Sequence, residues 1–348
     1  MDGQQVMEAI KNKLRDEEYG FLRREPLASQ TILLGLGGSY AYGTNVPGSD
    51  IDIRGIAVHS AKEILTGKGF EQIENRETDT VVYSLKKIVS LLSECNPNTV
   101  EILGLEPWQY IVMTDAGKKL VDNAGMFLSK RAARSFGGYA NATLWRLKQK
   151  GVRGADQEAQ EQHILNSIES ARHSFPEKYF PEGGEIRLYT DKAVNPEFET
   201  EIFMDISLKH YPLRDYKCMW AEMQNITKSY AKIGQRNSKA FEIGKWTRNM
   251  MHLIRLYGMS FDILEEGKIV TYRRKDHEFL MDIRNGKYSG EDGLPTDEFY
   301  SIVAEYENRL KEDTEKTKLP DNPDYEKINR IVADINREIV EKHREENK

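Results

Sequence analysis

The sequence predicts an α+β protein, in which a small mixed sheet with flanking helices is followed by an all-helical region. Two features of the pattern lead to this prediction. Up to about residue 125, short apolar or β-branched runs alternate with helical patterns, and beyond residue 126 apolar side chains recur every three or four residues. A chain of 348 residues is long enough for two domains. We therefore expect one domain over residues 1–125 and a helical domain over residues 126–348.

The first domain begins with a weak amphipathic helix pattern at residues 5–16, and patterns of a strand, a turn and a second strand occupy residues 31–58. A β-rich run at residues 79–84 leads into a helix at 85–93, where the apolar residues share one face. Asn96-Pro97-Asn98 ends this helix, because the residue before a proline avoids the helical conformation.

The helical patterns of the second domain are interrupted by a stretch rich in Pro, Gly and acidic residues at 174–200, which indicates an insertion or a hairpin. The helix expected at 129–150 combines basic and aromatic side chains. Such side chains can hold a single nucleic-acid strand. The alternative is that the aromatic side chains pack in the core and the basic side chains are solvated. Further helices are expected at residues 213–233, 239–257, 299–310 and 328–339.

The most informative motif lies at residues 37–54. A buried strand at 31–36 runs into Gly37-Gly38-Ser39, and two aspartates, Asp50 and Asp52, follow ten residues later. A strand that enters glycines and then a short helix can aim backbone N–H groups at an anion. Carboxylates two residues apart on a strand share a face, where they repel each other unless a cation lies between them. A phosphate cradle beside such a pair is typical of a magnesium–nucleotide site.

Two carboxylates rarely hold two metal ions, so a third is expected on a neighbouring strand. The candidate is Asp79, which opens the run at 79–84, and Glu77 is the alternative on the same face. In this hypothesis Asp50, Asp52 and Asp79 hold one ion that activates an acceptor hydroxyl. Asp50 and Asp52 hold a second ion that grips a triphosphate.

Other residues are candidates for binding the nucleotide. The Gly38 N–H and the Ser39 hydroxyl are expected to hold the β- and γ-phosphates. Arg54 shares the face of the aspartates, where it pairs with Asp52 or Glu77 or contacts the nucleotide. On the helix at 239–257 four polar residues at spacings of three and four form one cationic face, and they are expected to reach phosphates or to be solvated: Lys245, Arg248, His252 and Arg255.

These residues resemble the DNA polymerase beta superfamily of nucleotidyltransferases, whose signature is a Gly-Ser pair followed by Asp-hydrophobic-Asp-hydrophobic. The chain further resembles a branch of large predicted nucleotidyltransferases associated with RNA repair in bacteria and phages. That likeness extends over roughly residues 30–290, at these segments: Gly43-Thr44, Ser49 to Gly55, Asn96-Pro97-Asn98 with Glu101, Arg236-Asn237, Lys245 to Leu256, and Ile283 to Gly286. The resemblance implies a polymerase-beta-like palm and transfer of a nucleoside monophosphate from an NTP with Mg²⁺ or Mn²⁺. It leaves the acceptor open.

Composition restricts the possible classes of acceptor molecule only in part. A net charge of −6 counts against a strong sequence-blind nucleic-acid binder, although a local basic groove remains compatible with it. We expect the 3′ hydroxyl of an RNA or tRNA as acceptor. The alternatives are nucleotidylation of a protein or small-molecule hydroxyl, and a non-catalytic NTP or RNA sensor. The polar start, the two distant cysteines and the lack of a long apolar stretch predict a cytoplasmic protein without a membrane segment.

Overall fold

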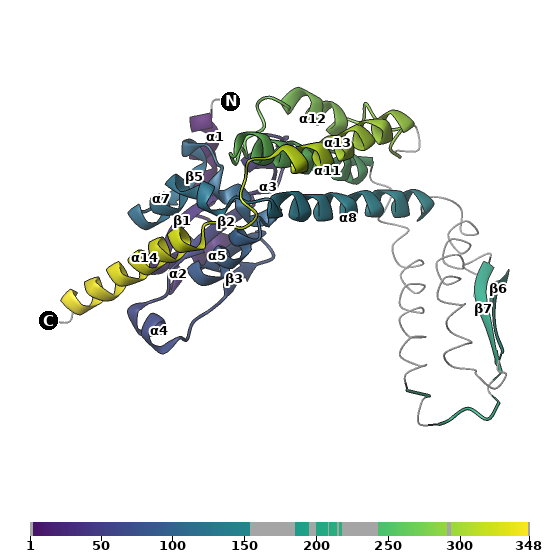
Figure 1. Ribbon diagram of the computed structural model, residues 1–348, viewed down its shortest axis with the longest axis horizontal. Coiled ribbons are helices and arrows are strands. Elements are labelled where there is room, and N and C mark those ends of the chain that lie inside the picture. The colour runs from purple at the N-terminus through teal and green to yellow at the C-terminus, as the bar shows by residue number, and fades with distance from the viewer. Residues whose placement is uncertain are drawn as a thin grey trace. The chain divides into compact units, whose positions relative to one another are not determined.

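The chain folds into two compact units (Figure 1). The computed structural model describes residues 3–153, 185–194, 200–207, 209–213, 216–217, 243–290 and 294–346. The first unit comprises residues 1–143, 247–290 and 295–348, and the second comprises residues 144–246 and 291–294. The first unit thus contains the sheet together with the later helices. The domain boundary at residue 125 stays a prediction.

A five-stranded mixed sheet forms the centre of the first unit. Its strands, in spatial order, are β3 (Gln72–Asn75), β4 (Thr80–Ser84), β2 (Ile53–Ala57), β1 (Thr31–Leu36) and β5 (Tyr110–Met113). β1 is antiparallel to β2 and β5, β3 is antiparallel to β4, and β2 is parallel to β4. The predicted α+β class is confirmed.

Apolar clusters cover both faces of the sheet. Successive side chains of β1 point to opposite faces, so this strand contributes to both clusters. Leu33 joins one apolar cluster, to which Ile88 of α5 (Leu85–Ser93) also belongs. Leu34 and Leu36 join a second cluster with Ile10 of α1 (Gly3–Lys13). The continuous apolar run that predicted this strand is therefore that of a strand buried on both sides.

Helices form near the predicted positions at 5–16, 85–93, 129–150, 239–257, 299–310 and 328–339, and the first unit contains further short helices that were not predicted. The helices that begin before residue 130 are α1, α2 (Leu27–Gln30), α3 (Gly38–Tyr42), α4 (Ala61–Thr66), α5, α6 (Pro97–Val100) and α7 (Asp115–Asp122). Those that begin later are α8 (Arg131–Arg153), α11 (Ile243–Glu266), α12 (His277–Arg284), α13 (Asp297–Lys316) and α14 (Tyr325–Glu346). Short 3₁₀ turns lie at Glu17–Arg23, Glu101–Leu103 (η2), Pro107–Gln109 and Ala124–Phe127. α8 and α11 each continue into the second unit.

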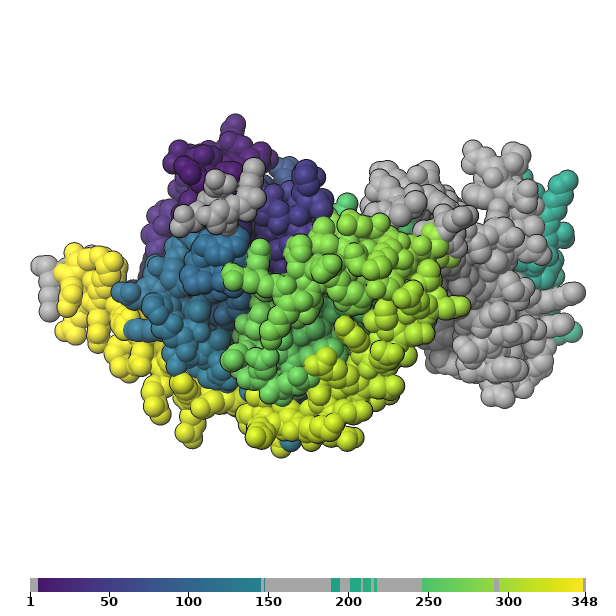
Figure 2. Space-filling view, turned by 90° about the horizontal axis from the view of Figure 1, so that it is seen from above, coloured from purple at the N-terminus to yellow at the C-terminus, as the bar shows by residue number. Residues whose placement is uncertain are grey.

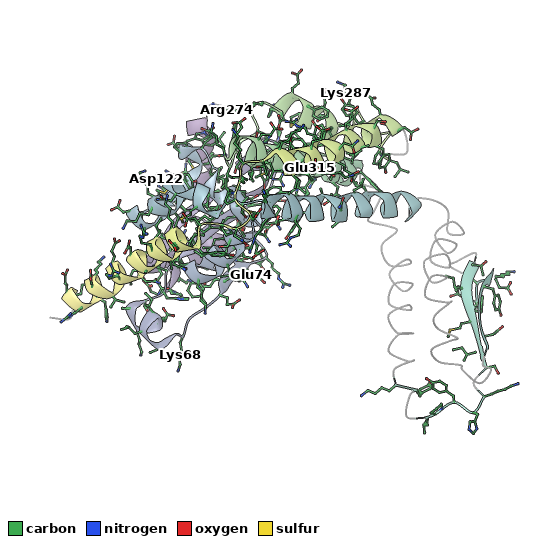
Figure 3. All side chains as sticks on the ribbon, in the orientation of Figure 1. Lys68, Glu74, Asp122, Arg274, Lys287 and Glu315 are labelled. Atoms are coloured by element: carbon green, nitrogen blue, oxygen red, sulfur yellow. The ribbon has the colours of Figure 1, made fainter. Side chains whose placement is uncertain are left out.

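The later helices pack onto the sheet domain through a shared core. Leu256, Met259 and Ile263 of α11 belong to the same buried cluster as Ile102 and Phe127. Figure 2 shows these segments, far apart in the chain, side by side on the surface of the first unit. Charged side chains such as Lys68, Asp122 and Lys287 point away from this unit (Figure 3).

Side-chain caps fix the first turns of α5 and α6. The Ser84 hydroxyl accepts a hydrogen bond from the Lys87 N–H and caps α5. The Asn96 side chain accepts one from the Asn98 N–H and caps α6.

The described part of the second unit contains an antiparallel pair of strands, β6 (Glu185–Lys192) and β7 (Thr200–Ser207). β6 lies within the stretch at 174–200, where an insertion or a hairpin was predicted, but its partner β7 begins only at Thr200, and the rest of that stretch lies outside the described residues apart from residues 193 and 194. The apolar helix predicted at 213–233 lies almost entirely outside the described residues. Over the ranges given above, no helix combines the length and apolar character needed to cross a lipid bilayer.

Candidate functional site

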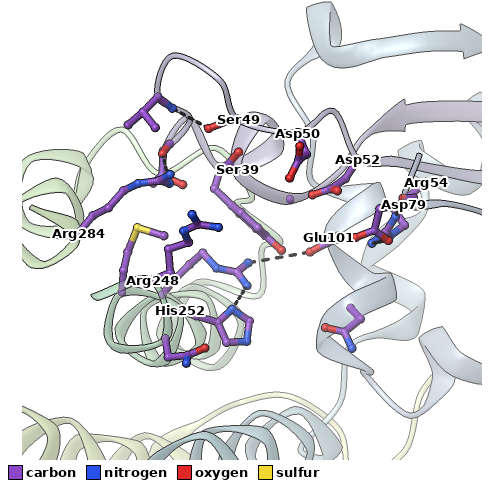
Figure 4. A pocket seen from close by; sticks show the side chains of 18 of the residues that line it. Ser39, Ser49, Asp50, Asp52, Arg54, Asp79, Glu101, Arg248, His252 and Arg284 are labelled. Atoms are coloured by element: carbon purple, nitrogen blue, oxygen red, sulfur yellow. Dashed lines mark hydrogen bonds and ion pairs between the residues drawn. The ribbon is translucent and has the colours of Figure 1, made fainter. Parts of the chain in front are cut away.

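A cavity of about 690 Å³ lies in the first unit, where β1 and β2 meet the turns beside them (Figure 4). It is lined by the Gly38-Ser39 turn, the stretch before β2, the start of β4 and the polar side of α11. Asn98 and Glu101, from α6 and η2, and Arg284 at the end of α12 complete the lining. The volume is in the range of small-molecule sites.

The turn after β1 is built tightly around glycine. Gly38 has φ +54°, in the left-handed region that favours glycine. A Cβ at Gly38 would come 1.6 Å from Asp52 Oδ2, so only glycine leaves room for that carboxylate. The turn is fixed from behind by Gln109, whose side-chain N–H group donates to the Tyr40 carbonyl at 2.8 Å and the Ala41 carbonyl at 3.0 Å.

Asp50 and Asp52 both line the cavity, but they precede β2 and do not lie within it. The prediction of a carboxylate strand is wrong in this respect. Regular pairing begins only at Ile53, opposite Leu36, because residues 45–52 form the connecting turn. One hydrogen bond, from the Gly37 N–H to the Asp52 carbonyl at 2.8 Å, still ties Asp52 to the end of β1.

The parallel pairing of β2 with β4 brings the third aspartate to the same place. Ile53 pairs with Thr80, so the preceding residues, Asp52 and Asp79, are neighbours at the edge of the cavity. Asp79 has φ +42°, a conformation that aspartate tolerates better than most residues. Glu77 is exposed and is not among the residues that line the cavity.

The electrostatic state of Asp52 shows that negative charge is concentrated here. Burial, and then the nearby carboxylates of Asp79 and Asp50, raise the pKa of Asp52 to about 6, while Arg54 opposes this shift. Of the alternatives for Arg54, the pairing with Asp52 or Glu77 is wrong, and contact with the nucleotide stays a prediction. The Arg54 guanidinium instead donates to the Asp79 carbonyl and, at 3.3 Å, to Asp79 Oδ1.

The carboxylates fit a hard cation in part. Their oxygens are the donors that Mg²⁺ and Mn²⁺ prefer, and a cation would relieve the repulsion that raises the pKa of Asp52. Across the described ranges, however, no three carboxylate, histidine or cysteine side chains come together as a complete metal site. Any cation held here would therefore need phosphate oxygens and water as further ligands, as is usual for Mg²⁺.

The opposite wall of the cavity is α11, and it differs from the predicted cationic face. Arg255 is 5% exposed, and its Cζ atom stacks 3.3 Å from the centre of the Tyr42 ring. Arg255 Nη1 lies 3.9 Å from Glu101 Oε2, and Nη2 lies 2.6 Å from His252 Nδ1. Burial lowers the pKa of Arg255 to about 10 and raises that of Glu101 to about 7, and each group opposes the shift of the other. Arg255 is thus engaged within the protein.

Two other arginines present positive charge to the cavity. Arg248 is exposed on α11, and Arg284 at the end of α12 donates to the Thr44 carbonyl at 2.6 Å. Burial and then the neighbouring Arg248 lower the pKa of Arg284, so the two guanidinium groups lie close to each other. The buried Thr44 hydroxyl, also at the cavity, has no hydrogen-bond partner among the described residues.

Sequence reasoning placed Arg248 in the cationic set without a role of its own. For Arg284 it left two alternatives, a surface loop and a structural or substrate-lining role suggested by the resemblance at Ile283 to Gly286, and the structure places this residue at the cavity. The structure brings Gly38, Ser39, Arg54, His252 and Arg255 together around the aspartates. The side chain of Lys245 lies outside what the structure describes.

Comparisons with known proteins agree with this geometry. Residues 5–159 match the model of a family described as the RNA repair pathway DNA polymerase beta family. The chain is also 24% identical over 291 residues to an uncharacterized 38.9 kDa protein of the nrdC-mobD intergenic region of Enterobacteria phage T4, a match that covers 74% of this chain and 84% of the phage protein. No solved structure matches the chain. Over residues 5–159, the resemblance to polymerase-beta-superfamily nucleotidyltransferases associated with RNA repair is therefore confirmed.

Proposed function

We propose that the protein is a metal-dependent nucleotidyltransferase that moves a nucleoside monophosphate from an NTP to the 3′ hydroxyl of an RNA or tRNA. The observation that carries this proposal is one cavity with carboxylates at one end and two close arginines at the other. The Gly38-Ser39 turn lies between them (Figure 4). A triphosphate has the charge to bridge the two ends.

Each end has its own part in binding. The Gly38 N–H and the Ser39 hydroxyl hold the β- and γ-phosphates, and Arg248 and Arg284 neutralise the terminal phosphate. Asp50, Asp52 and Asp79 would hold the cations. When bound, these ions supply charge neutralisation at the triphosphate and lower the pKa of the acceptor hydroxyl.

The remaining side chains orient the reactants. Arg54 holds Asp79 in place through both its carbonyl and its carboxylate. The acceptor hydroxyl loses its proton to solvent, and attack of its oxygen on the α-phosphorus forms one P–O bond, breaks the bond to the oxygen that bridges to the β-phosphate, and releases pyrophosphate. Positioning and electrostatic stabilisation supply most of the rate enhancement in reactions of this kind. RNA repair, as the family description states it, supports an RNA end as the acceptor.

The test is incubation with each α-³²P-labelled NTP, Mg²⁺ or Mn²⁺, and total RNA. We expect label in RNA with wild-type protein and no label with Asp50→Asn or Asp52→Asn. Chelation of the metal with EDTA should abolish the labelling as well. Label in protein, or release of pyrophosphate without labelled RNA, would contradict the proposed acceptor. NTP binding without turnover would instead indicate a sensor.

A further inference from the structure

The cavity extends past the aspartates on the side of β4. Its lining there includes Val81 and Tyr83 of β4 and Asn98 of α6, which the binding of a triphosphate leaves unused. Val81 and Tyr83 are two residues apart and therefore share one face of the strand. Both are partly exposed, whereas the residues on either side of each are buried. This part of the cavity thus has an apolar wall that contains an aromatic ring.

The strand order places this wall on the far side of the aspartates from the triphosphate turn. β2, which Asp52 precedes, lies between β1 and β4. The Gly38-Ser39 turn follows β1, and Asp79 precedes β4. Figure 4 shows Arg248 and Arg284 on one side of Asp52 and Asp79 on the other.

This arrangement decides from which side the acceptor approaches. In reactions of this kind the attacking and leaving oxygens lie roughly in line, on opposite sides of the phosphorus. Resting on the proposed function, pyrophosphate leaves on the side of the Gly38-Ser39 turn and the two arginines. The acceptor hydroxyl then reaches the α-phosphorus from the side of Asp79, and the rest of the acceptor lies along Val81 and Tyr83.

The surroundings of Tyr83 suit a flat, uncharged group. The guanidinium of Arg54 beside it is engaged by Asp79 Oδ1 at 3.3 Å. Burial raises the pKa of Tyr83, Arg54 opposes this shift and Tyr139 of α8 adds to it, so the phenol lies near both residues. Tyr139 is itself anchored, since its hydroxyl accepts a hydrogen bond from the Asn96 side chain at 3.3 Å. A ring with fixed neighbours loses little conformational freedom when a ligand stacks on it.

We propose that Tyr83 is the platform on which the 3′-terminal base of the acceptor RNA stacks. Every base has a face that can stack on an aromatic ring, so this contact accepts RNA ends of different sequence. The ribose that carries the 3′ hydroxyl then lies between Tyr83 and the carboxylates. The exposed side-chain amide of Asn98 offers both donors and an acceptor to the polar edge of the terminal nucleoside. Tyr83 binds the substrate and takes no part in proton transfer.

The stacking contact is tested by removing each of its partners in turn. The probes are two short single-stranded RNAs, one that ends in adenosine and one that lacks the terminal base but keeps the 3′ hydroxyl. We expect Tyr83→Leu to raise the KM for the first RNA roughly tenfold and Tyr83→Phe to leave it nearly unchanged. The RNA without the base should show the same rise with wild-type protein, and Tyr83→Leu should add nothing to it. An equal effect of Tyr83→Leu on both RNAs overturns the proposal.

Controls separate this role from a structural one. Tyr83→Leu should leave the Kd for a non-hydrolysable NTP analogue unchanged, because the triphosphate lies on the other side of Asp52. An equal loss of NTP affinity would indicate a distorted cavity and overturn the acceptor role. Tyr325→Leu removes an exposed tyrosine that does not line the cavity, and it should change neither constant. If Tyr83→Leu does not fold, the two RNAs are compared with wild-type protein, and equal KM values overturn the proposal.

Failure of the proposed function is distinguishable from failure of this inference. If wild-type protein transfers no NMP to either RNA, the proposed function is contradicted. Fluorescence anisotropy with the same two labelled RNAs then still decides whether Tyr83 contacts the terminal base, and equal affinity for both overturns the contact. Labelling of a protein in place of RNA overturns both proposals.

Discussion

The carboxylate of Asp52 occupies the space that a side chain on Gly38 would need. A Cβ at Gly38 would lie 1.6 Å from Asp52 Oδ2, and its φ of +54° adds backbone strain of about 1 kcal/mol for any other residue. We expect Gly38→Ala to displace Asp52 and to lower NMP transfer at least about tenfold. Gly67→Ala is the control, because Gly67 has φ +69° but no atom within 4 Å of its Cβ position, and it does not line the cavity beside Asp52. Similar losses of activity in both variants would mean that backbone strain alone is responsible.

Replacing Asp52 by Asn should stabilise the metal-free protein although it abolishes activity. The pKa of Asp52 is raised from 3.8 to about 6, so the folded state binds more protons than the unfolded state between these values. The free energy of unfolding therefore falls as the pH rises through this window. We expect Asp52→Asn to unfold a few degrees higher than wild type at pH 7.5, on the order of 3 °C, and at the same temperature below pH 3.8. Thermal unfolding in EDTA measures this, and a less stable variant at pH 7.5 would contradict it.

Removing Arg54 should shift the pH dependence of the reaction. Arg54 opposes the rise in the pKa of Asp52, so Arg54→Met should raise that pKa further. We expect the acid limb of the plot of kcat/KM against pH to move to higher pH. Arg76→Met serves as the control, since the Arg76 side chain is 91% exposed and does not line the cavity. An acid limb at the same pH in Arg54→Met and wild type would show that Asp52 does not govern it.

The two cavity arginines should discriminate a triphosphate from a monophosphate. Replacing Arg248 or Arg284 by Ala removes a charge-assisted contact, which corresponds to roughly a tenfold loss of NTP affinity. Affinity for the matching NMP should change little, because it lacks the terminal phosphates. Equilibrium binding of both nucleotides measures the difference, with Arg337→Ala on the exposed face of α14 as the control. Equal losses of affinity for NTP and NMP would mean that these arginines contact a part of the nucleotide that both molecules share.

The identity of the third carboxylate can be decided by a pair of matched variants. Asp79→Asn keeps a residue that tolerates φ +42° and removes only the charge. We expect it to lose NMP transfer by a factor of roughly 100 or more, by analogy with the loss of other transition-state electrostatic contacts. Glu77→Gln, exposed and away from the cavity, should retain activity. The reverse result would assign the role to Glu77.

The parts of this site that the sequence predicts are those set by short-range patterns. The strand β1 and the helix α5 can be predicted directly, because burial leaves a pattern of apolar residues close together in the sequence. For β1 this pattern is a continuous apolar run, and for α5 it is an apolar residue every three or four positions. The Gly-Ser turn and the aspartates are recognised because their chemistry requires those residue types at close spacing. The exact start of β2 could not be predicted, because it depends on where pairing with β1 begins.

The second wall of the cavity shows why the rest could not be predicted. The spacing of residues 245, 248, 252 and 255 correctly places them near one another on a helix, but it says nothing of what faces them. Arg255 is buried against Glu101 and Tyr42, which lie far earlier in the sequence. Arg284 reaches the Thr44 carbonyl across 240 residues of sequence. Contacts of this length leave no periodic signal.

Two of the contacts that hold the cavity together are made to backbone carbonyls. Arg284 donates to the Thr44 carbonyl, and the Arg273 N–H donates to the Tyr42 carbonyl at 3.0 Å. A carbonyl oxygen is present whatever side chain the residue carries. The side chain of residue 44 can therefore change without detaching Arg284, whereas the side chain of Tyr42 also stacks on Arg255 of α11. A change of side chain at position 44 would thus alter the lining of the cavity beside the two arginines and leave the end of α12 attached.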